Sequence, residues 1–485
     1  MDPKVKEISL KERTISGVKW TGASALFTKI ISLVKIPILA RLLAPSDFGL
    51  LGMLQTVLMF SNPLADMGLG SAVIQKKNIN HVQLSTLYWL NLAIGLVTFF
   101  GLLLAGPLVS DFFKEERLEH LMIFVALIFL MLPLGSQFQR LMEKQLKFGL
   151  TTKIDMMSNI VNFCITVVLA YMGWGVYALL YGRLSGAVTS SSLLIFFGLK
   201  IHAPGFHFSL KESKGLLSFG GFQLAERFLK ILSSNLDKIL IGKFLGAEIL
   251  GYYTIAYTLV VIPIFTLNPL ITKVTFPVFS IIQNEHKRIN RYFTKAINLL
   301  VMMNFPIYAG IIVTAPNFVP LIFGDQWTPS IIIIQILSME ALLWTISNPV
   351  GSLLLAKGKA DISFILNIFR ALSLVLFISL AYYISPSIQS IALAIVLSRY
   401  FIDPFIHFYM SKVHGIEYQT ILRTISAILL ATSGMVGMAL AVQLLDISNP
   451  YFELSFKIFL GVITYVLLLF VFAKESRNLL LSLRK

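Results

Sequence analysis

Residues 218–245 read SFGGFQLAERFLKILSSNLDKILIGKFL, a hydrophobic segment long enough to cross a bilayer that nevertheless carries charged side chains. Each charge facing lipid at mid-membrane would cost about 2.5–3.5 kcal/mol, so such residues face a bundle interior or a watery cavity. Steps of three and four place four polar residues on one helix face: Arg227, Lys230, Ser234 and Lys238. This pattern predicts a cationic wall of a transport cavity. The alternative is a structural helix with internal pairs, such as Glu226 with Lys230 at i,i+4.

The composition predicts that the whole chain is a membrane protein. Of 485 residues, 56% are hydrophobic and 13% are charged, whereas about a quarter of the residues in a soluble protein are charged. The net charge of +16 would favour nucleic acid as the partner of a soluble chain. Here the basic residues fall in alternate loops, as the positive-inside rule predicts, so no nucleic-acid partner is expected. The single cysteine, Cys164, excludes an intrachain disulfide framework and a cysteine-rich metal site.

Hydrophobic runs of about 20 residues predict fourteen membrane spans, and therefore an all-α integral membrane protein. They lie near residues 15–43, 47–67, 83–106, 118–138, 150–171, 175–198, 217–243, 248–271, 292–314, 329–355, 362–383, 387–409, 419–445 and 453–473. The first run is too long for a cleaved signal peptide. The longest polar connections, near 199–216 and 272–291, leave no room for a folded domain outside the membrane.

Lysine and arginine predict the topology. With a cytoplasmic N-terminus, one set of loops holds basic residues such as Lys76 with Lys77 and Lys357 with Lys359, while the opposite loops hold few. An even number of spans then places both termini in the cytoplasm.

An internal repeat predicts two halves. LAPSDFGLLGM (Leu43–Met53) aligns without gaps with LGAEILGYYTI (Leu245–Ile255), matching Gly49 to Gly251. The first span then corresponds to the seventh. The predicted division is a lobe at 1–199, a cytoplasmic linker at 200–216, a second six-span lobe at 217–411, and two further spans with a tail at 412–485. Parallel repeats of this kind are a known transporter plan. Chance similarity between apolar helices is the alternative.

Other polar residues inside the spans are further candidates. Lys29 and Lys35 form a predicted buried pair in the first span, and Arg399 is expected to pair with Asp403 at i,i+4. Span five carries Asn162 and Thr166, which interhelical hydrogen bonding explains at least as well as transport does. No phosphate-binding GxxxxGK[ST] loop, HExxH motif or plausible paired-carboxylate motif is present, so neither an enzyme nor a cofactor is predicted.

Three segments resemble a known family. They are SGVKWTGASALFTKIISLVKIPILARLLAPSDFGLLGM (Ser16–Met53), the junction inside it at Ala40–Gly49, and ADMGLGSAVIQKK (Ala65–Lys77). With the six-six-two plan, they make the chain similar to the Wzx-type polysaccharide flippases of the MOP superfamily, which also contains the MATE exporters and the lipid II flippase MurJ. The junction looks closest to the branch that exports colanic or teichuronic acid units.

The resemblance implies two lobes that open alternately to either side of a bacterial cytoplasmic (inner) membrane, with the first six spans rocking against the next six. The implied cargo is an undecaprenyl-pyrophosphate-linked oligosaccharide, moved to the outer leaflet for surface polysaccharide synthesis. It also implies function as a monomer, with a polysaccharide polymerase or other assembly proteins as possible partners.

The cationic residues agree with a pyrophosphate cargo, because basic groups in a desolvated cavity bind phosphate oxygens strongly. The predicted binding residues, in order, are Arg227 and Lys230, Lys29 and Lys35, and then Lys238, Arg370 and Arg399. The predicted ion-coupling residues are Glu340, Asp403 and Asp155. A MATE-like antiporter of small molecules is the first alternative, and cavity acids would favour it. A membrane glycosyltransferase or polymerase is the second, and would need a sizeable outer loop with catalytic residues.

Overall fold

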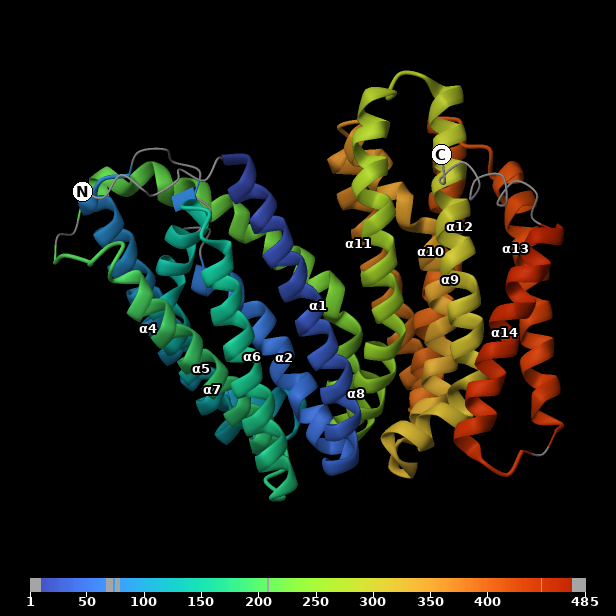
Figure 1. The fold of residues 1–485 in the computed structure, drawn as a ribbon, viewed down its shortest axis with the longest axis horizontal. Coiled ribbons are helices and arrows are strands. Elements are labelled where there is room, and N and C mark those ends of the chain that lie inside the picture. The colour runs from blue at the N-terminus through green and yellow to red at the C-terminus, as the bar shows by residue number, and fades with distance from the viewer. Residues whose placement is uncertain (1–9, 67–72, 75–78, 207–208, 446, 473–485) are drawn as a thin grey trace. The chain divides into compact units, whose positions relative to one another are not determined.

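The computed structural model describes residues 10–66, 73–74, 79–206, 209–445 and 447–472, and it describes the side chains of these residues except at 10–14, 64–66, 210–234 and 424. Long α-helices build this part of the chain (Figure 1). They are α1 (Leu10–Leu42), α2 (Pro45–Asp66), α4 (His81–Phe113), α5 (Arg117–Lys144), α6 (Phe148–Tyr171), α7 (Val176–Gly198), α8 (Leu210–Ile281), α9 (His286–Phe323), α10 (Ser330–Ala356), α11 (Ala360–Ile384), α12 (Ile388–His414), α13 (Tyr418–Gln443) and α14 (Pro450–Phe472), with the short 3₁₀ helix η1 (Asp325–Trp327) after α9.

The helices confirm the predicted all-α membrane fold. Within the described residues, twelve helices are long and apolar enough to cross a membrane; α8 counts once in this set and α2 is not in it. Helix α8 is interrupted at Gly246, whose φ of 82° and ψ of −176° are not helical. A positive φ of this size favours glycine, which has no Cβ to clash with the backbone. The two parts of α8 therefore correspond to the predicted spans at 217–243 and 248–271.

Several helices run further than the hydrophobic runs predicted. Helix α8 begins at Leu210, inside the predicted linker, and it continues to Ile281. Helix α9 begins at His286, so residues 282–285 alone join α8 to α9. The expectation of a long polar connection near 272–291 is therefore wrong. The reason is that hydropathy marks where lipid ends, whereas polar residues can continue a helix beyond the bilayer.

The chain forms two compact units, at residues 1–248 and 249–485. In the first unit, α5 packs against α4 and α7, α6 packs against α7 and α1, and α2 packs against α4, α5 and α7. Small residues allow close helix approach: a Cβ at Gly182 of α7 would overlap the Thr166 hydroxyl of α6, and a Cβ at Gly198 would overlap the Phe138 ring of α5.

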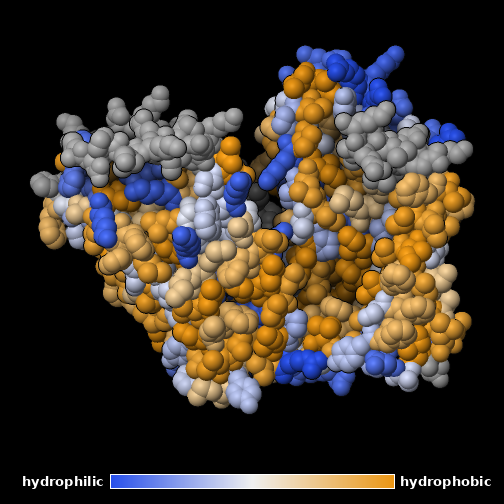
Figure 2. Space-filling model, in the orientation of Figure 1, coloured by the Kyte–Doolittle hydropathy of each residue, from blue (hydrophilic) through white to orange (hydrophobic). Residues whose placement is uncertain are grey.

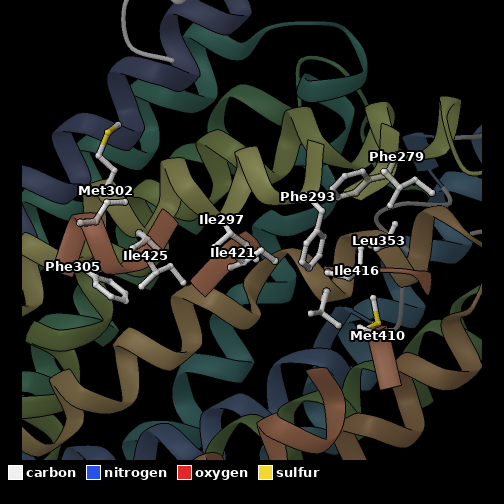
Figure 3. Packing of buried hydrophobic residues seen from close by; sticks show 14 of the residues in the cluster. Phe279, Phe293, Ile297, Met302, Phe305, Leu353, Met410, Ile416, Ile421 and Ile425 are labelled. Carbon is white, nitrogen blue, oxygen red and sulfur yellow. The ribbon is translucent and has the colours of Figure 1, made fainter. Parts of the chain in front are cut away.

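In the second unit, α9 packs against α10, α13 and α14, while α12 packs against α10 and α11. Figure 3 shows part of its core, where Phe279, Phe293, Leu353, Ile421 and Met410 lie together although they come from five helices. Helices α13 and α14, the two additional spans, are thus part of this unit. The division of the chain into lobes at 1–199 and 217–411 stays a prediction.

Hydrophobic residues cover most of the visible helix sides in both units, and many hydrophilic residues lie near helix ends (Figure 2). Large apolar side chains are accordingly exposed on several helices, for example Leu104 at 78% on α4 and Phe408 at 63% on α12. This distribution is the reverse of a soluble protein surface and matches a bilayer as the solvent.

Candidate functional site

Lys35 of α1 is held by neutral oxygen atoms of α6. Its Nζ donates to Asn162 Oδ1 at 2.7 Å and to Thr166 Oγ1 at 3.1 Å. The Thr166 hydroxyl in turn donates to the Asn162 carbonyl at 2.6 Å, so both acceptors are fixed by the same turn of α6. Among the residues that the structure describes, no carboxylate pairs with Lys35. The positive charge of Lys35 is therefore oriented but not neutralised.

A second cation lies on α7, the helix that packs against α6. Arg183 of α7 is exposed and close enough to Lys35 to act on it electrostatically. The close packing of α6 on α7 places it there: Ser158 Oγ donates to the Gly186 carbonyl at 2.8 Å, and Gly182 leaves room only for the Thr166 hydroxyl. Two like charges at one site repel each other. An anion between or beside them would remove this repulsion and accept charge-assisted hydrogen bonds from both.

Lys29 and Asp155 are the other residues of α1 and α6 that were predicted to bind the substrate or a coupling ion. Lys29 is exposed on α1, so the expectation of a buried Lys29–Lys35 pair is wrong. The physical reason is the helical period, because six residues turn the side chain by about 120° around the axis. Asp155 is half-buried on α6, seven residues before Asn162 and hence on the same face.

The charged face of α8 is only partly described. Lys238 is 8% exposed and lies near Asp237, which is also 8% exposed. Arg227 and Lys230 lie within α8 but outside the residues whose side chains the structure describes. Their role in binding stays a prediction.

The second unit brings four predicted residues into one charge network. Arg399 of α12 donates from Nε to Glu340 Oε1 of α10 at 2.9 Å and lies over the Trp344 ring, 5.4 Å from its centroid. Asp403 accepts from Arg370 NH2 of α11 at 3.1 Å, and its other oxygen is 3.9 Å from Arg399 NH1. The predicted Arg399–Asp403 pair is confirmed, although Glu340 is the closer partner of Arg399. Two arginines and two carboxylates make this network electrically neutral.

The network continues through Ser347, His407 and Tyr418, which are not among the predicted site residues. Ser347 Oγ of α10 donates to Asp403 Oδ2 at 2.7 Å and lies 3.2 Å from His407 Nε2. His407 Nδ1 lies 2.8 Å from the Tyr418 hydroxyl at the start of α13. His407 follows Asp403 by one helical turn on α12, but no signal in the sequence pointed to Ser347 or Tyr418. With its side chain 2% exposed, Asp403 is fully engaged, and a coupling ion there would compete with Arg370.

In the part of the chain that the structure describes, no three His, Cys, Asp or Glu side chains are grouped so that they could hold a metal ion. The two sites thus differ in kind. The site of the first unit offers donors and net positive charge, and the site of the second unit offers a balanced set of donors and acceptors.

Comparison with known proteins places the chain in a family. The family described as "Polysaccharide biosynthesis protein" matches residues 38–332. The chain is 36% identical to the lipopolysaccharide biosynthesis protein WzxC of Escherichia coli K12 (75% of this chain, 74% of the relative) and 34% identical to the teichuronic acid biosynthesis protein TuaB of Bacillus subtilis (73% and 74%). It is 25% identical to the succinoglycan biosynthesis transport protein ExoT of Rhizobium meliloti (73% and 72%).

Solved structures agree on the fold. The lipid II flippase MurJ in an inward closed conformation superposes with a TM-score of 0.74 at 15% identity, covering 96% of this chain and 100% of MurJ. An inward-facing multidrug resistance MATE transporter of the MOP superfamily gives a TM-score of 0.54 at 15% identity, covering 79% and 93%. The chain therefore belongs to the polysaccharide biosynthesis protein family, has the Wzx-type protein WzxC among its relatives, and shares its fold with MurJ and the MATE transporter.

Proposed function

We propose that this chain is a flippase that moves an undecaprenyl-pyrophosphate-linked oligosaccharide from the cytoplasmic to the outer leaflet of the bacterial inner membrane, by alternating access. Family membership supports the reaction class, since relatives are named for polysaccharide biosynthesis and transport. In this proposal both termini lie in the cytoplasm, the protein works as a monomer and performs no covalent chemistry, and the product serves surface polysaccharide synthesis.

The observation that carries the proposal is the pair of cations at Lys35 and Arg183. A pyrophosphate presents several charged oxygens, which suit the planar fork of Arg183 and the third donor of the Lys35 ammonium, whose other two donors are bonded to Asn162 and Thr166. Asn162 and Thr166 hold the ammonium in place before the ligand arrives, so less side-chain entropy is lost on binding. A cationic substrate, as expected of a MATE-like antiporter, would be repelled at the same place.

The three carboxylates that were predicted to bind a coupling ion differ in whether they are already paired with an arginine. Glu340 and Asp403 are already bonded to Arg399 and Arg370, whereas no ion pair of Asp155 is found among the described residues. We therefore propose Asp155 as the first candidate for a coupling proton or sodium ion. Unchanged flipping after the ion gradients are collapsed would remove this role from all three carboxylates.

The test is translocation of an undecaprenyl-pyrophosphate-linked oligosaccharide in proteoliposomes. Each charge-assisted hydrogen bond contributes about 1.5–3 kcal/mol, so Lys35→Met combined with Arg183→Met is expected to slow flipping by about tenfold or more. Lys153→Met removes an exposed cation from α6 and is the matched control, with flipping near that of the unchanged protein.

Two results would count against the proposal. Full flipping by the Lys35 and Arg183 double variant would move the pyrophosphate site elsewhere, first to Arg227 and Lys230. No flipping by the unchanged protein, across several pyrophosphate-linked oligosaccharides, would contradict the function itself.

A further inference from the structure

The charge network of the second unit is joined to a tryptophan. Glu340 and Trp344 are four residues apart on α10 and therefore share one face of this helix. Arg399 of α12 contacts both, since its Nε donates to Glu340 Oε1 at 2.9 Å and its guanidinium carbon lies 5.4 Å from the centroid of the Trp344 ring. Phe265 of α8 meets the same ring at an angle of 83°, with centroids 6.2 Å apart. We call these four side chains the Trp344 cluster.

Part of the Trp344 cluster is accessible. The Arg399 and Glu340 side chains are 19% and 15% exposed, and the Arg370 side chain of the same network is 30% exposed. Trp344 itself is half-buried. These residues belong to α10, α11 and α12, which are apolar enough to cross a membrane. Because a charged side chain within such a helix avoids lipid, the accessible part of the cluster must face water inside the protein.

Hydrogen-bonding groups around Trp344 remain unused. A guanidinium carries five N–H donors, whereas Arg399 uses Nε on Glu340 and brings NH1 only to 3.9 Å from Asp403. Asn348 lies one turn after Trp344 on α10, and its buried Oδ1 accepts no hydrogen bond from the described residues. A buried acceptor without a partner is uncommon in folded proteins. The surroundings of Trp344 thus offer a ligand both donors and an acceptor.

The balance of charge decides which ligand these groups fit. A phosphate at this place would meet the carboxylates of Glu340 and Asp403 as well as the two arginines, so attraction and repulsion would largely cancel. A hydroxyl is uncharged and both donates and accepts. A sugar ring combines several hydroxyls with an apolar C–H face, and an indole ring offers a large apolar surface beside polar groups. The chemistry therefore favours a sugar over an anion.

We infer that the Trp344 cluster, together with Asn348, binds a sugar ring of the oligosaccharide, whereas the pyrophosphate binds at the cations of the first unit. This inference rests on the proposed function, which supplies the oligosaccharide as the cargo. It gives Arg399 a different ligand from the one that the sequence predicted, namely sugar hydroxyls in place of pyrophosphate oxygens. It also makes the second unit the part of the chain that distinguishes one glycan from another.

Binding of free glycans tests the inference. The probes are the oligosaccharides that mild acid releases from the lipids of the flipping assay, titrated by calorimetry into the full chain in a detergent without a sugar head group. Trp344→Leu should weaken binding by about tenfold, because the aromatic surface is lost, and Trp344→Phe should keep most of the affinity. Trp174→Leu removes a tryptophan that is 46% exposed at the turn before α7 and is the matched control, with unchanged affinity.

A second variant keeps the test decisive if Trp344→Leu does not fold. Arg399→Lys keeps a positive charge beside Glu340 but loses the planar set of donors, and it should also weaken glycan binding by about tenfold. The variant with Lys35→Met and Arg183→Met should bind the free oligosaccharides as the unchanged protein does, since these probes carry no phosphate. Equal affinity of the unchanged protein, Trp344→Leu and Arg399→Lys would overturn the inference, and so would the absence of binding by the unchanged protein.

The failure of this inference can be told from failure of the proposed function. If the unchanged protein binds a free oligosaccharide through Trp344 but flips none of the lipid-linked forms, the proposed function fails and the sugar site stands. If the protein flips the lipids but binds the free oligosaccharides equally well without Trp344, the sugar site is wrong and the proposed function stands.

Discussion

At the scale of single residues, the partner of a cation decides what it can do. Lys35 is bonded to an amide and a hydroxyl, so its charge remains available to a ligand. Arg370 and Arg399 are bonded to carboxylates, so a ligand must first displace an acid. The sequence showed that all three are polar residues inside apolar spans, which predicted an internal location. It ranked Lys35 ahead of the two arginines, but it could not show which of the three pair with a carboxylate, because the nearest partner of each comes from a different helix.

The Arg370–Asp403 pair gives a prediction on stability. Arg370→Leu would remove the nearer of the two cations that pair with the almost fully buried Asp403 carboxylate and leave only Arg399, 3.9 Å away. Breaking a buried pair costs up to about 3–5 kcal/mol. Thermal unfolding in detergent should therefore occur at a clearly lower temperature. Replacing both residues by leucine should recover most of the loss, since no unpaired charge remains. Arg423→Leu, at an exposed position of α13, is the control. Additive losses in the double variant would show that the pair does not act as one unit.

At the scale of elements, the side chain of Asp47 holds together the junction at Ala40–Gly49, the segment whose sequence resembled the family. Asp47 in the first turn of α2 accepts from the Ala44 amide at 3.1 Å through one oxygen, and from the Val176 amide at the start of α7 at 3.1 Å through the other. The carboxylate thus caps one helix and fastens it to a second. The sequence showed the junction at Ala40–Gly49 as a resemblance to the family, but it showed neither of these two contacts of Asp47.

We predict that Asp47→Ala lowers the stability of the first unit by about 1–2 kcal/mol, as loss of a helix cap does. Asp47→Asn should cost less, because it keeps one acceptor oxygen. Thermal unfolding measures both effects, with Asp111→Ala at an exposed position of α4 as the control. Equal stability of the alanine and the unchanged protein would show that the two amides find other acceptors.

Residues 201–206 with Ser209, which we call the strap, follow α7 and are bonded to α4 through the Gly205 and Ser209 amides. The attachment of the strap is predicted to depend on pH. Burial, together with the neighbouring His81, lowers the pKa of the His202 imidazole from its ordinary value of 6.5. The docked strap therefore binds a proton less readily than the undocked strap. Its docking should be fully stable above about pH 6.5 and should weaken as the pH falls below that value.

Hydrogen exchange checks this expectation. The Gly205 and Ser209 amides, which are bonded to α4, should lose protection between about pH 7.5 and pH 5.5 after correction for the intrinsic exchange rate. In His202→Leu the protection should change little with pH. Identical protection of the unchanged protein at both pH values would contradict the account.

At the scale of the whole molecule, the positions of the spans could be predicted because a bilayer requires each backbone group to be bonded within its own helix. Uninterrupted apolar runs therefore mark the spans, and even the break at Gly246 falls in the predicted gap between two of them. The packing of the chain before and after the first part of α8 could not be predicted. It depends on contacts such as Trp89 with Gly205 and Gly49 with Ala247, which join residues far apart in the sequence.

The most direct test of the central claim compares two lipids in the same proteoliposomes: one oligosaccharide linked to undecaprenyl through pyrophosphate, and the same oligosaccharide on an uncharged polyprenyl anchor. If the cations at Lys35 and Arg183 receive the pyrophosphate, the first lipid should cross at least about tenfold faster, and this preference should vanish in the double variant. Equal rates for both lipids in the unchanged protein would contradict an anion-selective flippase.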